Sequence, residues 1–176
     1  MRPGPIQPKR ELKRAGHPLT VGEVAALTEK LTPAHAEIVW AMAVTGMGPG
    51  ELWGRWQVLP DRVHIAGTKR SGRVRDVPLV RAIRRPERGY QAFRVVLSEA
   101  SGELVEPYDF RRSFATWLEA AGIPRTRRRL YLGHGATSVT DLYERHQVDA
   151  FLAEDAEKLR TVLGEAVSAT ALRVVR

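Results

Sequence analysis

Apolar residues recur at helical spacing through the first third of the chain. Thr20 and Glu23 have the spacing of a capping box, and the apolar positions after them predict a first helix. Thr32-Pro33 predicts the start of a second helix, because proline is tolerated in a first turn, and Gly46 is suited to end it. A further short helix is expected over residues 49–55.

The pattern then changes to short segments typical of strands. Residues 57–59 and 62–65 are partly β-branched, and residues 74–77 alternate between apolar and polar side chains. Pro60-Asp61 is a turn signal between the first two segments, and the two glycines within residues 66–73 predict a loop before the third. We therefore expect a small three-stranded antiparallel sheet.

Helical patterns return in the rest of the chain. Helices are predicted over residues 84–98, 109–121, 124–132, 137–144 and 148–163, with Asp109 as the cap of the second and Gly122 as its end. The last helix carries an apolar stripe, suited to packing either on the chain's own core or on a neighbouring protomer. The predicted fold class is α+β, mostly helical, with the small sheet beside the helices.

Composition divides the chain into one folded unit and two ends. Residues 1–17 contain three prolines and five basic side chains, which predicts a basic flexible lead-in, and residues 18–165 and 166–176 are expected to form one domain and a tail. The absence of cysteine excludes disulfides and cysteine-based sites. No apolar run has the length of a membrane span or a secretion signal, so we expect a cytoplasmic, nucleoid-associated protein that does not enter membranes.

Charge narrows the class of partner. The net charge is +8, and 23 of the 28 basic residues are arginines. A strongly basic chain suggests a polyanionic partner, and arginine makes planar bidentate contacts to phosphate. A GC-rich gene would also raise the share of arginine, but it does not explain the net charge. Double-stranded DNA is therefore the expected partner.

Four segments carry residues suited to phosphate chemistry. In chain order they are Thr45–Leu52, Thr68-Lys69, Tyr108–Ala115 and Leu132-Gly133-His134, and Tyr143 follows nine residues after the histidine. In this order and spacing they resemble the catalytic domain of tyrosine recombinases, the phage-integrase family. That family reads Thr-Gly-x-Arg-x-x-Glu-Leu, a hairpin lysine, His-x-x-Arg, Leu-Gly-His and then a tyrosine. The resemblance spans roughly residues 18–163.

The resemblance implies a role for each matching residue. Tyr143 would attack the phosphodiester, Arg111 and His134 would bind its oxygens, and Lys69 would protonate the leaving oxygen. Tyr108 stands where the family usually has histidine and can still donate a hydrogen bond. Such chemistry implies no metal and no nucleotide cofactor. The ordinary alternatives are a half-buried tyrosine, a structural histidine and solvated basic side chains.

Further arginines near these motifs are candidate DNA contacts. Guanidinium groups that contact backbone phosphates fix a protein on the duplex without reading its sequence. The alternative is a solvated basic surface. The candidates are Arg70, Arg73, Arg112, Arg125, Arg127, Arg128 and Arg129.

One departure from the family pattern leaves the function open. Gly48 stands where the family has its first arginine, and no nearby arginine has a spacing that obviously substitutes. Loss of one such donor costs on the order of 100- to 1,000-fold in rate.

The first hypothesis is a recombinase of a mobile element that integrates or recombines DNA through a 3′-phosphotyrosyl intermediate, as a homo-oligomer on DNA. The second is a catalytically degenerate DNA-binding relative, accessory to a partner recombinase. A type IB topoisomerase fits the motif spacing less well.

Overall fold

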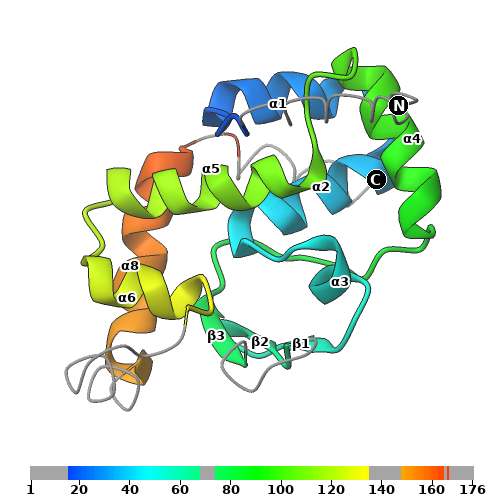
Figure 1. Cartoon of the computed structure of the whole chain (residues 1–176). Coiled ribbons are helices and arrows are strands. Elements are labelled where there is room, and N and C mark those ends of the chain that lie inside the picture. Colours follow the sequence, from blue (N-terminus) through cyan, green and yellow to red (C-terminus); the bar gives the residue numbers. More distant parts are fainter. Residues whose placement is uncertain (1–15, 68–73, 135–147, 165, 167–176) are drawn as a thin grey trace, which may run out of the picture.

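The computed structural model describes residues 16–67, 74–134, 148–164 and 166 (Figure 1). This part of the chain forms seven helices and one three-stranded antiparallel sheet. The expected α+β class, mostly helical with a small sheet, is confirmed. None of the helices in these ranges is long and apolar enough to cross a membrane.

Two N-terminal helices follow the predicted signals. Helix α1 (Val21–Glu29) begins with the expected capping box, in which the Thr20 hydroxyl accepts from the Glu23 backbone N–H at 3.2 Å. Helix α2 (Pro33–Thr45) begins after Thr32 and ends at Gly46, which has a φ of 64°. All residues from Ile38 to Thr45 are buried, so α2 is the central helix, against which α1 and α5 pack.

The sheet has the predicted order and connection. Strand β1 (Trp56–Val58) pairs antiparallel with β2 (Arg62–Ile65), and β2 pairs antiparallel with β3 (Arg75–Pro78). Val63 and Val77 are partners across β2 and β3, and both are buried. Because side chains alternate along a strand, Arg75 lies on the same buried face as Val77.

Two predicted helices have different bounds in the structure. Helix α3 (Pro49–Leu52) is shorter than expected. The prediction of a helix from residue 84 is wrong at its start, since α4 runs over Tyr90–Ser101. The residue before a proline disfavours the helical backbone, and Arg85 precedes Pro86. The Arg85 guanidinium instead lies over the Trp56 ring at 4.8 Å and donates to the Gly54 carbonyl at 3.0 Å.

Three further described helices follow α4, of which the first packs on α2 and the other two contact β3. Helix α5 (Pro107–Ala120) is capped by Glu106 rather than Asp109, because Asp109 lies in the first turn and its carboxylate accepts from the Glu106 N–H at 2.9 Å. Helices α6 (Arg125–Tyr131) and α8 (Val148–Leu163) follow. The predicted helix over residues 137–144 lies outside the described residues.

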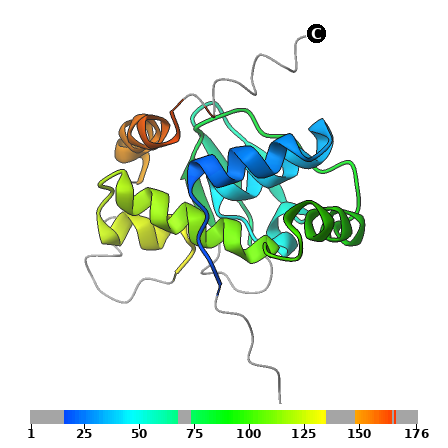
Figure 2. The ribbon, with the colours of Figure 1, turned by 90° about the horizontal axis from the view of Figure 1, so that it is seen from above.

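Helix α8 packs on its own chain. It contacts β3 and α5, and Figures 1 and 2 both show it beside α5 and α6. Its apolar stripe is buried there at Leu152, Ala156, Leu159 and Leu163. Of the two alternatives left by the sequence, this structure contains the first, packing on the chain's own core.

Candidate functional site

A buried carboxylate connects three of the sequence segments. Glu51, only 5% exposed, accepts two hydrogen bonds from Arg75, one to Oε1 at 2.5 Å and one to Oε2 at 3.1 Å. The same Oε2 accepts from the Gly48 backbone N–H at 3.0 Å and lies 3.4 Å from Arg111 Nη1. Burial opposes ionisation, but the donors from Arg75, Gly48 and Arg111 hold the pKa of Glu51 below its ordinary value.

Local sequence explains why Glu51 reaches this position. Pro49 opens α3, and Glu51 is the third helical residue, from which a carboxylate can turn back to the N–H that precedes the helix. Upstream, Gly46 ends α2 in the left-handed region. A Cβ there would lie 2.5 Å from the ring of Phe114, so glycine is required by backbone and by space. The Thr-Gly…Glu-Leu motif therefore builds a tight turn that delivers one carboxylate.

Arg111 connects the ends of two helices. From α5 its Nη1 donates to the Gly46 carbonyl at 2.7 Å, and its Nη2 donates to the Leu132 carbonyl at the end of α6. The side chain is 14% exposed. Its planar fork is therefore fixed by backbone carbonyls and by Glu51, which is the preorganisation that oxyanion binding needs.

Arg75 belongs to the same cluster, although sequence reasoning did not assign it to the site. Its Nε donates to the Tyr131 carbonyl at 2.8 Å, and its side chain is 3% exposed. The available signal was its alternation with Val77, which places an arginine on the inward face of a strand. An inward arginine needs a buried carboxylate, and Glu51 provides it.

The Leu-Gly-His motif forms the end of α6. Gly133 has a φ of 65°, and its N–H donates to the Leu130 carbonyl at 2.9 Å. The His134 N–H donates to the Arg129 carbonyl, also at 2.9 Å. These two bonds make a complete Schellman motif, in which glycine is favoured at the left-handed position. The backbone of His134 is thus fixed against the last turn of α6.

The His134 ring lies in a positively charged environment. Burial lowers its pKa, and the charges of Arg111, Arg129 and Arg75 lower it further. These three residues come from α5, α6 and β3. The neutral imidazole is therefore the favoured form near pH 7, with one nitrogen able to donate and the other able to accept.

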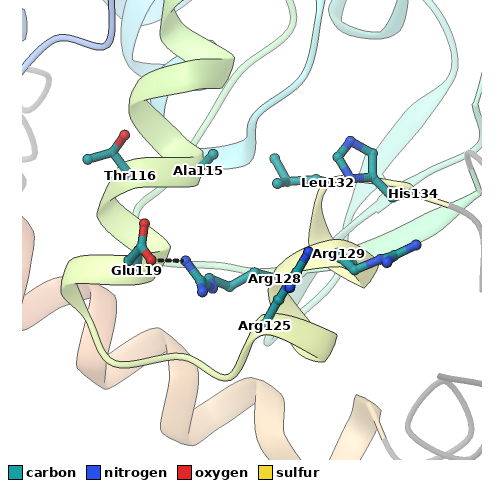
Figure 3. A pocket seen from close by; sticks show the side chains of 8 residues that line it. All are labelled: Ala115, Thr116, Glu119, Arg125, Arg128, Arg129, Leu132 and His134. Carbon is teal, nitrogen blue, oxygen red and sulfur yellow. Dashed lines mark ion pairs between the residues drawn. The ribbon is translucent and has the colours of Figure 1, made fainter. Parts of the chain in front are cut away.

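A pocket of about 440 Å³ opens beside His134, between α5 and α6. Figure 3 shows Arg129 extending below His134, whereas Arg128 reaches toward Glu119 on α5 and Arg125 lies between the two. Arg128 pairs with Glu119 across the pocket at 2.9 Å. The remaining lining residues are Ala115, Thr116 and Leu132. Three of the four α6 arginines predicted to contact DNA thus border one hollow.

The fourth α6 arginine has a different place. Arg127 is 7% exposed, its guanidinium lies over the Phe151 ring at 4.3 Å, and its Nε is 3.5 Å from the buried Asp155 carboxylate. Both partners belong to α8. We therefore correct the expectation of a DNA contact at Arg127, because this side chain attaches α6 to α8.

Two predicted residues on α5 form a separate pair. Tyr108 is 51% exposed, and the Arg112 guanidinium lies 5.1 Å from its ring centre. Arg112 Nη1 also donates to the Asp109 carboxylate at 2.8 Å, and its guanidinium lies against Gly16. Tyr108 is one helical turn before Arg111, whereas Arg112 faces the segment that precedes α1.

The structure thus brings together Arg111 and His134, two of the predicted catalytic residues, and adds Glu51 and Arg75. Of the other three predicted catalytic residues, Tyr108 lies exposed on α5 beside Arg112, and Tyr143 and Lys69 lie outside the described residues, as do Arg70 and Arg73. Within the described ranges, no group of three or more His, Asp or Glu side chains is placed to hold a metal ion.

Comparison with known proteins adds no relative. No protein-family model, no curated protein and no solved structure matches this chain.

Proposed function

We propose that this chain binds double-stranded DNA and cuts and rejoins it through a 3′-phosphotyrosyl intermediate, as tyrosine recombinases do. The observation that carries the proposal is the meeting of two motifs distant in sequence. Arg111 Nη2 donates to the Leu132 carbonyl, two residues before His134, so the arginine of one motif is fixed to the Leu-Gly-His turn of another. A scissile phosphate bound at this junction would meet a guanidinium and an imidazole together.

The chemical step follows from these groups. The ionised hydroxyl of Tyr143 would attack phosphorus, forming a tyrosyl–phosphate bond while the bond to the 5′ oxygen breaks. Lys69 would give its proton to that leaving oxygen. Arg111 and His134 would bind the non-bridging oxygens, where charge rearranges in the transition state. The reverse attack by a 5′ hydroxyl would rejoin the strand, so neither a metal nor a nucleotide is required. On this proposal the protein works as an oligomer on the DNA of a mobile element.

A specific observation favours a second candidate. Gly48, where the resemblance expects an arginine, has no side chain and takes part only through its backbone, whose N–H donates to the Glu51 carboxylate and whose carbonyl accepts from the N–H groups of Glu51 and Leu52. A catalytically degenerate protein that binds DNA, accessory to a partner recombinase, would tolerate this glycine. The two candidates differ in whether a covalent protein–DNA adduct forms.

The experiment is covalent trapping on DNA. The protein is incubated with a pool of nicked duplexes of random sequence, the reaction is stopped with SDS, and the adduct is measured beside Tyr143→Phe. An adduct in the wild type that is lost in Tyr143→Phe supports strand transfer. DNA binding with no adduct in either protein supports the accessory candidate, and an adduct that persists in Tyr143→Phe contradicts Tyr143 as the nucleophile.

A further inference from the structure

Gly48 leaves the proposed site with one guanidinium, from Arg111, where the transition state of phosphoryl transfer benefits from two. The structure contains another arginine, Arg129, that lines a pocket together with His134. We propose that Arg129 of α6 supplies the second phosphate-binding guanidinium, in place of the arginine absent at position 48. This inference rests on the proposed function and names a catalytic residue for it.

The backbone fixes Arg129 and His134 together. The Arg129 carbonyl accepts the His134 N–H at 2.9 Å, so the two residues are joined by the last hydrogen bond of the α6 Schellman motif. Their side chains line the same pocket, and Figure 3 shows the Arg129 side chain extending below the His134 ring. Arg111 is attached to the same turn through the Leu132 carbonyl. One turn of chain therefore carries the backbones of Arg129 and His134 and accepts a hydrogen bond from Arg111.

Electrostatics agree with this geometry. The charges of Arg111 and Arg129 both lower the pKa of His134, after burial. The two positive charges that would bind the phosphate therefore also favour the neutral form of the imidazole. A phosphodiester beside His134 would be within the field of both.

The other arginines of the region are less suited to this role. Arg75 directs all three guanidinium nitrogens to Glu51 and the Tyr131 carbonyl, and its side chain is 3% exposed. Arg128 extends toward Glu119 on α5, away from His134 (Figure 3). Arg125 lies four residues, about 6 Å along the helix, farther from the end of α6 than Arg129 does. Arg129 is the member of this group that combines the right helix end with a side chain in the pocket.

Position 48 offers a direct test of whether Arg129 replaces the absent arginine. A Cβ at Gly48 meets no heavy atom within 4 Å, and the residue has an ordinary extended backbone with a φ of −77°. Its N–H donates to the same Glu51 oxygen that lies beside Arg111. An arginine introduced here has space and begins next to the proposed phosphate site.

The experiment measures single-turnover adduct formation at saturating concentrations of the nicked random-sequence duplex pool. Arg129→Ala is expected to slow adduct formation by about 100- to 1,000-fold, with a much smaller rise in the Kd for DNA. Arg129→Lys keeps the charge but loses the planar fork, so its rate should be intermediate. Adding Gly48→Arg to Arg129→Ala should restore at least a large part of the lost rate. Arg94→Ala, which removes an exposed arginine from α4, is the control for charge alone.

The outcomes separate this inference from the proposed function. Adduct formation in Arg129→Ala at the wild-type rate overturns the role of Arg129 and leaves strand transfer intact. A slow Arg129→Ala that unfolds at the wild-type temperature and is not rescued by Gly48→Arg also overturns it, because the second guanidinium is then not interchangeable. No adduct from the wild type overturns both proposals.

Discussion

Arg111 Nη1 and the Gly46 carbonyl are 2.7 Å apart, although 65 residues separate them in the chain. This hydrogen bond attaches the middle of α5 to the left-handed turn that ends α2. Because Gly46 is also packed against Phe114 of α5, the turn and the arginine are fixed by the same helix. The guanidinium therefore reaches the site with little freedom left to lose on binding a phosphate.

Replacement of Arg111 by lysine should distinguish the contribution of its positive charge from that of its planar guanidinium group. Lysine keeps the positive charge but cannot bind two backbone carbonyls and a carboxylate in one plane. We expect adduct formation to slow by roughly 100-fold or more, with a smaller change in DNA affinity. Single-turnover trapping and a binding titration measure the two quantities. Equal rates for Arg111→Lys and the wild type would contradict a role for the fork.

The Glu51–Arg75 pair should contribute to stability rather than to DNA affinity. Its two side chains are 5% and 3% exposed, and removal of one partner leaves a buried charge. Arg75→Met is expected to lower the free energy of unfolding by about 3–5 kcal/mol. Urea denaturation measures this loss. The double variant Arg75→Met/Glu51→Gln should lose much less unfolding free energy than the sum of the losses in the two single variants. Additive losses would show that the two side chains do not interact.

The same carboxylate predicts acid sensitivity. The pKa of Glu51 is lower in the folded protein than its ordinary value of 4.5, so the unfolded chain binds the proton more readily. Its stabilisation is present above pH 4.5 and is lost as the pH falls through the folded pKa. The free energy of unfolding should therefore decrease below pH 4.5. Glu51→Gln should show a shallower decrease, and an unchanged slope would assign the effect to other carboxylates.

Two arginines of one helix should behave differently toward salt. Arg125 is exposed in the pocket wall, whereas Arg127 is buried against α8. Arg125→Ala should reduce the salt slope of DNA binding by about 1, because one phosphate contact is lost. Arg127→Ala should leave the slope unchanged and lower the free energy of unfolding by about 1–3 kcal/mol. Fluorescence anisotropy over a salt series and urea denaturation test both. A reduced salt slope in Arg127→Ala would show that Arg127 contacts a DNA phosphate.

DNA binding should strengthen as the pH falls toward the pKa of His134. In the free protein this pKa is below its ordinary value of 6.5, owing to burial and to Arg111, Arg129 and Arg75. A bound phosphodiester favours the charged imidazole and raises the pKa, so binding takes up a proton. Titrations between about pH 8 and 5.5 should show tighter binding at the acid end. His134→Asn should remove much of this dependence, and an equal dependence in both proteins would contradict it.

The sequence predicts best where local chemistry decides the structure. Thr20, Thr32 and Gly46 mark helix boundaries correctly, because capping and left-handed ends depend on neighbouring residues. The beginning of α4 is predicted too early although Pro86 gives a local signal, because the residue before a proline disfavours the helical backbone. The packing of Arg85 on Trp56, a contact distant in sequence, could not be predicted. Arg75 and Arg127 are assigned correctly only when their burial is known. In a basic chain, the sequence alone does not distinguish an arginine that contacts DNA from one that pairs with a buried carboxylate.

Tyr131 links local unfolding of α8 to the arginine cluster. Its carbonyl accepts from Arg75 Nε, while its hydroxyl donates to Asp155 of α8 at 2.7 Å. Burial and this bond to Asp155 raise the pKa of Tyr131, which keeps the hydroxyl protonated as a donor. Local unfolding of α8 would therefore remove the anchor of a residue that also holds the arginine cluster. Backbone amides of α8 and of the end of α6 should exchange with solvent as one cooperative unit.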